Sequence, residues 1–358
     1  MVDLFRTPTI EALADVVLPA LEQCCEEGWF DPSAAERSAG IEPLSGIMDT
    51  GGRSGQLHYL CYDSAKFDAI REQGATATFR GAIVISHGFT EFAEKYDELV
   101  WYFLLAGYSV CVLEHRGHGK SARDVDNRCM VWIDDWQRYV ADLAGFAETI
   151  GQQYAAGMPL NLFCHSMGGG IGAAVMEHYP SLFDKAVLSA PMIAPVVGMP
   201  TWIARIATGA LCGLGFGKAR VFGHTDFSPE LDLDEHKGAS EARVRWFHKQ
   251  RVDDVACQTN AATFEWAHQA MALSRAILKP DMCGAIETPM LLFQAGRDIW
   301  VLNGPQDDFV ERVREGGGSI EKIRYGKSLH EIFSMPNTVV GPYVNKILDF
   351  LSAPADSL

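Results

Sequence analysis

The chain has 358 residues, of which 48% are hydrophobic and 21% charged, and this balance excludes a disordered tail protein. At roughly 150 residues per domain, the length indicates about two structural units, or one large unit with an insertion. The formal net charge of −16 would be repelled by phosphate backbones, so we expect no nucleic-acid partner.

Cysteine usage and the N-terminal sequence bear on where the protein works. The nine cysteines are an odd number without a repeated spacing, which argues against a disulfide framework. The first residues lack the charged-then-apolar pattern of a signal peptide, and no stretch is long and apolar enough to span a bilayer. We therefore expect a reduced, cytoplasmic protein, with a place at the periphery of a membrane left open.

Short apolar runs bounded by Gly, Pro or charge predict buried strands. Five of them are almost continuous and a sixth alternates apolar with polar residues, and they lie at 82–86, 108–113, 160–164, 185–190, 289–295 and 319–325. Continuous apolar strands are typical of a parallel sheet that is covered on both faces.

Helical periodicity separates these runs. Apolar residues recur at three- and four-residue steps over 133–150, with Asp134 or Asp135 near the helix start. A further helix is expected around 347–351, where Pro342 suits a first helical turn. Strands alternating with helices predict an α/β fold with a mostly parallel, doubly wound sheet.

Two parts of the chain depart from this alternation. Residues 1–50 are interpreted as a mainly helical N-terminal extension, with a helix over 10–27 that Pro19 starts or kinks. Strands also stop between residues 192 and 281, where 240–251 and 263–278 look helical. We therefore predict a core formed by 51–191 and 282–358, with 192–281 as an inserted helical cap.

One strand leads into a turn that fits a nucleophile elbow. The run 160–164 is followed by His165-Ser166-Met167-Gly168 and then by a helical segment. Such a turn lifts the serine hydroxyl above the sheet edge, and the Met167 N–H at the helix start can hold an oxyanion. Gly168 meets the need for a small residue, whereas Cys164 replaces the expected first glycine.

A serine needs a base, and the base needs an orienting acid. Asp298 follows the strand 289–295 and His330 follows the strand 319–325, so both arrive at the carboxyl edge of the sheet in the order Ser, acid, His. Taken singly, Asp298 could cap a helix and His330 could be a surface histidine. Their joint order favours a triad with Ser166.

A second oxyanion donor is expected from the loop after the strand 82–86. Gly88 would let the backbone approach a ligand closely, so the Phe89 N–H would pair with that of Met167. The alternative interpretation is a plain glycine turn.

The predicted cap supplies candidate substrate-contacting residues. They are apolar and lie in or next to the stretch 202–216: Met192, Trp202, Leu211 and Phe216. Such a stretch is as consistent with ordinary core packing as with an acyl-binding function.

Two further patterns in the sequence are compatible with other types of site. Gly168-x-Gly170-x-x-Ala173 matches a dinucleotide fingerprint, but residues 189–191 offer no carboxylate where that site needs one. His115 and His118 have the spacing of metal ligands, but no third ligand completes a site. We therefore predict neither a cofactor nor a metal.

Six segments resemble the monoacylglycerol lipase and lysophospholipase L2 family of α/β-hydrolases, and the lysophospholipase L2 group most closely. They are His-Gly-Phe-Thr-Glu at 87–91, Glu-His-Arg-Gly-His-Gly-Lys-Ser at 114–121, Cys-His-Ser-Met-Gly-Gly at 164–169, the cap segments 240–247 and 263–266, and Leu-His-Glu-Ile at 329–332. The resemblance covers about residues 53–352.

The resemblance implies an α/β-hydrolase fold and a serine hydrolase that cleaves carboxylic esters of single-chain lipids, either lysophospholipid or monoacylglycerol. It implies Ser166, Asp298 and His330 as the triad, an acyl-enzyme intermediate and a lipid ester as the partner. An acyltransferase using the same acyl-enzyme and a catalytically silent binding protein are the alternatives. The cap is a candidate for transient membrane contact, and the oligomeric state is left open.

Overall fold

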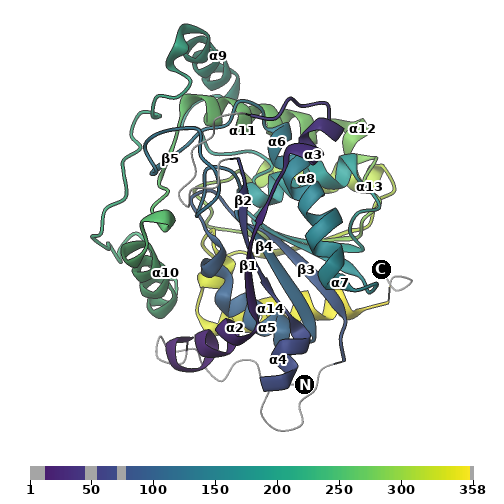
Figure 1. The fold of residues 1–358 in the computed structure, drawn as a ribbon. Helices are drawn as coiled ribbons and strands as arrows, with labels where there is room; N and C mark the ends of the chain where they lie inside the picture. Colours follow the sequence, from purple (N-terminus) through teal and green to yellow (C-terminus); the bar gives the residue numbers. More distant parts are fainter. Residues whose placement is uncertain (1–12, 45–54, 71–77, 355–358) are drawn as a thin grey trace.

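The computed structural model describes residues 13–44, 55–70 and 78–354. Within them, eight strands form one sheet in the order β1-β2-β4-β3-β6-β7-β9-β10 (Figure 1). Their bounds are β1 (Cys25–Phe30), β2 (Leu57–Tyr62), β3 (Gly81–Ser86), β4 (Tyr108–Leu113), β6 (Leu160–His165), β7 (Lys185–Ser189), β9 (Met290–Ala295) and β10 (Ile320–Tyr325). A separate short pair joins β5 (Met130–Val131) to β8 (Ala261–Ala262).

The sheet is parallel from β4 to β10, as the sequence predicted. In this sheet β2 alone runs in the opposite direction, and it pairs antiparallel with β4 on one side and with the edge strand β1 on the other. All six predicted strands are present, with ends within one residue of the expected ones. The inner strands β3, β4 and β6 are buried along their whole length, which explains their continuous apolar sequence.

Helices cover both faces of the sheet, and each face has its own apolar cluster. Alternate residues of β3 point to opposite sides, so Ala82 and Val84 join one cluster while Ile83 and Ile85 join the other. The first cluster is covered by α6 (Gln137–Phe146), α7 (Gln152–Ala155), α8 (Met167–His178), α11 (Phe264–Ile277), α12 (Pro280–Cys283) and α13 (Asn303–Glu315). The second is covered by α2 (Leu18–Cys24), α4 (Ser64–Ile70), α5 (Asp97–Leu105) and α14 (Asn337–Ser352). This is the doubly wound arrangement (Figure 1).

Short 3₁₀ and π turns join several of these elements. They are η1 (Leu13–Val17), η2 (Ala93–Tyr96), η3 (Ala147–Gly151), η4 (Cys212–Phe216), η5 (Val255–Cys257) and η6 (Ile332–Ser334). No helix in the described residues is long and apolar enough to cross a bilayer.

Two predicted helices have different ends in the structure. The helix expected over 10–27 stops at Cys24, because residues 25–30 pair with β2 as an edge strand; residues 10–12 lie outside the described part. The C-terminal helix α14 begins at Asn337, so Pro342 lies inside it instead of in its first turn. The buried stripe of Val340, Val344 and Ile347 continues past this proline and keeps the helix on the sheet.

The segment between β7 and β9 contains the helices that the sequence predicted there. They include α9 (Thr201–Leu211), α10 (Glu241–Asp253) and α11, whose N-cap Thr263 accepts a hydrogen bond from the Trp266 amide. The inner face of α11 packs against α8, whereas α9 lies at the outside of the molecule (Figure 1). Arg243 fastens α10 to the core by pairing with Glu98 and donating to the Met335 carbonyl. The division at residues 192 and 281 stays a sequence-based prediction.

Candidate active site

The predicted nucleophile stands on a strained turn between β6 and α8. Ser166 has φ 51° and ψ −118°, a left-handed conformation that side chains rarely adopt, and α8 starts at the next residue. The helix approaches the neighbouring strand so closely that a Cβ on Gly168 would lie 2.1 Å from the Ser86 carbonyl oxygen. Only glycine fits there, which is the physical reason for the small residue expected after the serine.

The three side chains that the sequence placed at the sheet edge are in contact. His330 Nε2 lies 2.7 Å from Ser166 Oγ, and His330 Nδ1 lies 2.6 Å from Asp298 Oδ2. Ser166 is 8% exposed and His330 9%, so the hydroxyl and the imidazole are sheltered from water but can be reached. An imidazole held between a hydroxyl and a carboxylate can accept the hydroxyl proton.

Asp298 is arranged to stay ionised. Burial acts to raise its pKa, but the hydrogen bond from His330 and the backbone amides oppose this, and the pKa is lowered overall. Asp298 Oδ1 accepts from the Trp300 and Val301 amides at 2.9 and 3.0 Å. A carboxylate fixed in this way can hold an imidazole in one orientation and stabilise its cation.

Both predicted oxyanion donors lie at turns beside Ser166. Met167 is the first residue of α8, where backbone N–H groups lack a partner within the helix. Phe89 follows Gly88 in a turn closed by a hydrogen bond from the Glu91 amide to the Gly88 carbonyl. The Phe89 ring packs on Trp266 of α11, with ring centroids 4.0 Å apart.

The four candidate cap residues separate into two groups. Met192 is 4% exposed, donates its amide to the Ser166 carbonyl at 2.7 Å, and lines a narrow apolar crevice with Met167 and Trp266. Trp202 and Phe216 are 66% and 54% exposed, and Leu211 is half-buried. The structure therefore brings Met192 to the nucleophile and places the other three on or near the outer surface of α9 and η4.

Sequence reasoning did not assign a function to three charged residues around the site. Glu91 and Lys95 form an ion pair, and Lys95 also pairs with Glu331, which follows His330. Glu91 and Glu331 are part of the family motifs at 87–91 and 329–332, so the resemblance could have pointed to these two residues. Lys95 gave no signal, because a Glu and a Lys four residues apart are typical of a solvated helix surface.

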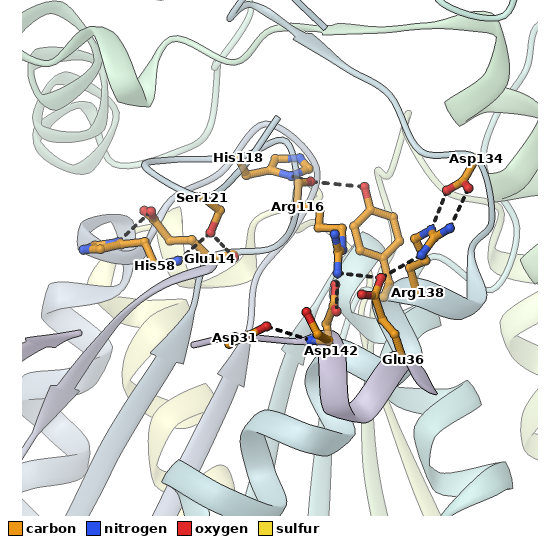
Figure 2. Close-up of polar contacts among 12 residues, drawn as sticks. Asp31, Glu36, His58, Glu114, Arg116, His118, Ser121, Asp134, Arg138 and Asp142 are labelled. Atoms are coloured by element: carbon orange, nitrogen blue, oxygen red, sulfur yellow. Dashed lines mark hydrogen bonds and ion pairs between the residues drawn. The ribbon is translucent and has the colours of Figure 1, made fainter. Parts of the chain in front are cut away.

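The loop 114–121 is held in place by buried hydrogen bonds and ion pairs. The Glu114 carboxylate accepts from His58 at 2.8 Å (Figure 2). It also accepts from the Lys120 amide at 2.7 Å. His58 and the neighbouring backbone hydrogen bonds lower the pKa of Glu114 to about 2 although burial opposes them. In the described residues, no group of three His, Cys, Asp or Glu side chains could hold a metal ion.

The same loop ties the N-terminal segment to the core. Arg116 pairs with Asp142 of α6 and with Glu36, which lies on α3 (Ser33–Ser38) and is 1% exposed (Figure 2). Arg138 of α6 also pairs with Glu36, at 2.7 Å. A buried carboxylate held by two guanidinium groups anchors α3 against α6.

Sequence comparison places this chain among known hydrolases. The family profile described as "Serine aminopeptidase, S33" matches residues 77–337. Lysophospholipase L2 of Escherichia coli strain K12 is 27% identical over 287 residues, which cover 75% of this chain and 80% of that protein. The monoacylglycerol lipase of Mycolicibacterium smegmatis is 31% identical over 128 residues, covering 36% of this chain and 44% of that protein.

Solved structures agree on the fold. A soluble variant of the Saccharomyces cerevisiae monoglyceride lipase has a TM-score of 0.62 at 20% identity, covering 86% of this chain and 94% of its own. A carboxyl esterase of Bacillus coagulans has a TM-score of 0.62 at 16% identity, covering 92% and 98%. These likenesses confirm the fold class that the sequence predicted.

Proposed function

Since the chain belongs to the serine aminopeptidase S33 family and has the α/β-hydrolase fold, we propose that it is a serine hydrolase that cleaves carboxylic esters of single-chain lipids. The relatives that bear the names lysophospholipase and monoacylglycerol lipase support an ester over a peptide substrate. The hydrogen-bonded chain from Ser166 through His330 to Asp298 carries the proposal.

The proposed reaction uses this chain of contacts twice. Ser166 Oγ attacks the ester carbonyl while His330 Nε2 takes its proton, and the amides of Phe89 and Met167 hold the oxyanion. The carbon–oxygen bond to the alcohol then breaks, and His330 returns the proton to the leaving oxygen. A water molecule deprotonated by His330 next attacks the acyl-enzyme, which releases the fatty acid and restores Ser166. Asp298 stabilises the imidazolium in both steps.

The side chains around Met167 are mostly apolar, which agrees with an acyl chain as one part of the substrate. Met192, Ile171, Trp266 and Leu273 line a crevice beside it. The volume of this crevice is only about 10 Å³, so an acyl chain would bind there only after these side chains move apart.

We further propose that α9 and its flanking turns touch a lipid surface. Exposed apolar side chains gather there: Val196, Met199, Trp202, Ile203, Ile206, Leu214 and Phe216. Although the whole chain carries −16, residues 192–225 contain no Asp or Glu and three basic residues, Arg205, Lys218 and Arg220. An apolar helix without acidic residues is suited to lie in a membrane interface. This supports a protein that associates peripherally with a membrane surface. A cytoplasmic location and a cap formed by 192–281 belong to the same proposal.

Product analysis tests the hydrolase proposal. Wild type and Ser166→Ala are assayed with a lysophospholipid, a monoacylglycerol and a short aryl ester, and labelling by a fluorophosphonate is measured. We expect wild type to release fatty acid and to be labelled, and Ser166→Ala to do neither, while Ser352→Ala, at an exposed serine of α14, behaves as wild type. Undiminished turnover by Ser166→Ala would refute the assignment.

Vesicle flotation tests the surface contact. Trp202→Ser combined with Phe216→Ser should reduce binding to vesicles of phosphatidylcholine and phosphatidylglycerol and leave turnover of a soluble aryl ester unchanged. Val252→Ser combined with Val255→Ser, at exposed apolar residues of α10 and η5, is the matched control. Equal binding by all three proteins would contradict the contact.

A further inference from the structure

A single buried carboxylate touches the loop of the proposed oxyanion donor and the strand of the proposed nucleophile. Glu91 is 3% exposed, and its Oε2 accepts from the Gly88 amide and from the Tyr96 hydroxyl, each at 2.5 Å. Its Oε1 accepts from Lys95 Nζ at 2.6 Å and lies 3.1 Å from His165 Nδ1. Gly88 precedes Phe89 and His165 precedes Ser166, so Glu91 lies one residue away from both groups.

Lys95 extends this contact to the loop of the proposed base. Its Nζ donates to Glu331 Oε1 at 2.6 Å, and Glu331 Oε2 accepts from the Ser334 hydroxyl at 2.8 Å. Glu331 is bonded to His330 in the chain. The Lys95 side chain is 3% exposed, and its ammonium lies over the ring of Phe247, 4.1 Å from the centroid, so α10 shields it from water.

The three charges of this cluster are ionised together. Burial acts to raise the pKa of Glu91 and of Glu331, but Lys95 outweighs it and both are lowered. Burial acts to lower the pKa of Lys95, but the two carboxylates raise it. The other titratable or charged groups facing the cluster include Tyr96, His87, His165, His330 and Arg251 of α10.

Such a cluster is an expensive way to obtain stability alone, because apolar residues of the same volume stabilise as well or better. The cluster instead lies where it can fix the positions of the segments around Ser166. Each of the three segments that would meet the ester carbonyl is a turn or loop beyond the end of a strand. The Gly88 amide donates to Glu91, Lys95 donates to Glu331 beside His330, and His165 lies 3.1 Å from Glu91. A charge-assisted hydrogen bond fixes both distance and direction.

We propose that Glu91 and Lys95 are positioning residues, which hold the Phe89 amide and the His330 loop in register with Ser166. The inference rests on the proposed function. Glu91 acts through Gly88: when the Gly88 N–H is tied down, the next peptide group cannot rotate, and the Phe89 N–H keeps its direction. Donors that are aligned in advance stabilise an oxyanion without reorganisation.

Steady-state kinetics with a short, soluble aryl ester test the proposal. Glu91→Gln keeps the size of the side chain but can no longer accept from every donor, so kcat should fall by about 10- to 100-fold, in the range of a lost or misdirected oxyanion donor. KM should change by less than about threefold, because ground-state binding is untouched. Lys95→Arg, which keeps the charge, should retain most of kcat.

The pH profile separates positioning from mere structural support. Lys95→Met leaves Glu91 buried without its cation, whereas Glu331 keeps a third of its side chain exposed, so Glu91 must take up a proton near neutral pH. A new ionisation should then appear in the pH dependence of kcat, and Lys95→Met combined with Glu91→Gln should remove it.

Glu36→Gln is the matched control, because it makes the same change at an equally buried, cation-paired carboxylate that contacts none of the three segments. It should lower stability and leave kcat unchanged. If Glu91→Gln and Lys95→Met keep kcat within about twofold of wild type and only lose stability, as Glu36→Gln does, the positioning function is refuted. A wild-type protein that hydrolyses no ester would instead refute the proposed function.

Discussion

The thiol of Cys164 fills the space that a side chain on Gly172 would need, since a Cβ on Gly172 would lie 2.4 Å from Cys164 Sγ. Cys164 is fully buried near the end of β6, and Gly172 lies in the second turn of α8, so the contact joins the two elements that frame Ser166. The elbow motif expects a glycine at position 164. Cys164 stands there instead, and the absence of a side chain at Gly172 leaves room for its thiol.

The pair predicts a compensating double substitution. Gly172→Ala should reduce the free energy of unfolding by about 1–3 kcal/mol, because the added methyl group overpacks a closed site. Cys164→Gly combined with Gly172→Ala should recover most of this loss. Urea unfolding of the four proteins in the cycle measures the coupling. Additive effects of the two substitutions would show that the contact does not limit packing at the elbow.

The strained backbone of Ser166 predicts that a residue without a side chain at this position makes the protein more stable but inactive. Ser166→Gly removes the side chain from a conformation with φ 51°, so it should raise the free energy of unfolding relative to Ser166→Ala by about 1 kcal/mol. Both variants should be inactive, because both lack Oγ. The comparison isolates the strain, since Ser166→Ala loses the same hydroxyl and keeps a Cβ. Equal stability of the two variants would mean that the turn stores no strain.

The sheet core and the contacts of the predicted triad follow from sequence for one physical reason. Strands that are buried on both faces are continuously apolar, so their carboxyl ends can be located, and parallel strands bring those ends to one edge. The edge strand β1 gives no such signal. It contains Glu26 and Glu27, which stay partly exposed, and its partner β2 lies about thirty residues away along the chain.

Features that depend on contacts across the fold could not be predicted. The pair of Glu91 and Lys95 has the spacing of a surface pair, and only the packing of Phe247 over Lys95 shows it to be buried. Trp202 and Phe216 were as consistent with core as with an acyl site, because an apolar stretch does not tell which of its sides is covered. The structure leaves both exposed.

The raised pKa of Glu94 predicts that its replacement stabilises the protein in a pH-dependent way. Burial, and then the charge of Glu114, raise the pKa of Glu94 from 4.5 to about 7. The folded protein therefore holds this proton more tightly than the unfolded chain, so the ionised carboxylate costs stability progressively between pH 4.5 and 7 and fully above.

Glu94→Gln should then raise the free energy of unfolding by about 2 kcal/mol at pH 8 and have little effect at pH 4. Thermal unfolding at the two pH values measures this difference. Glu22→Gln, at an exposed carboxylate of α2, should show no such dependence. A stabilisation by Glu94→Gln that is the same at both pH values would contradict the assigned titration.

The ammonium of Lys185 predicts a stability contribution at the end of α14. Lys185 begins β7 and donates to the backbone carbonyls of Phe350 and Ala353 at 2.7 and 2.5 Å, where the partial negative charge of the helix end gathers. Lys185→Met should lower the free energy of unfolding by about 2 kcal/mol, because these buried carbonyls lose a charged donor.

Lys346→Met is the comparison, because Lys346 lies on the same helix in an exposed ion pair with Glu321. Its replacement should cost less than about 0.5 kcal/mol, since water screens such pairs. Chemical denaturation of both variants decides between the two contributions. If Lys185→Met lowers the free energy of unfolding no more than Lys346→Met does, water satisfies the carbonyls of α14 as well as the ammonium does. Burial at this position would then give the hydrogen bonds no added strength.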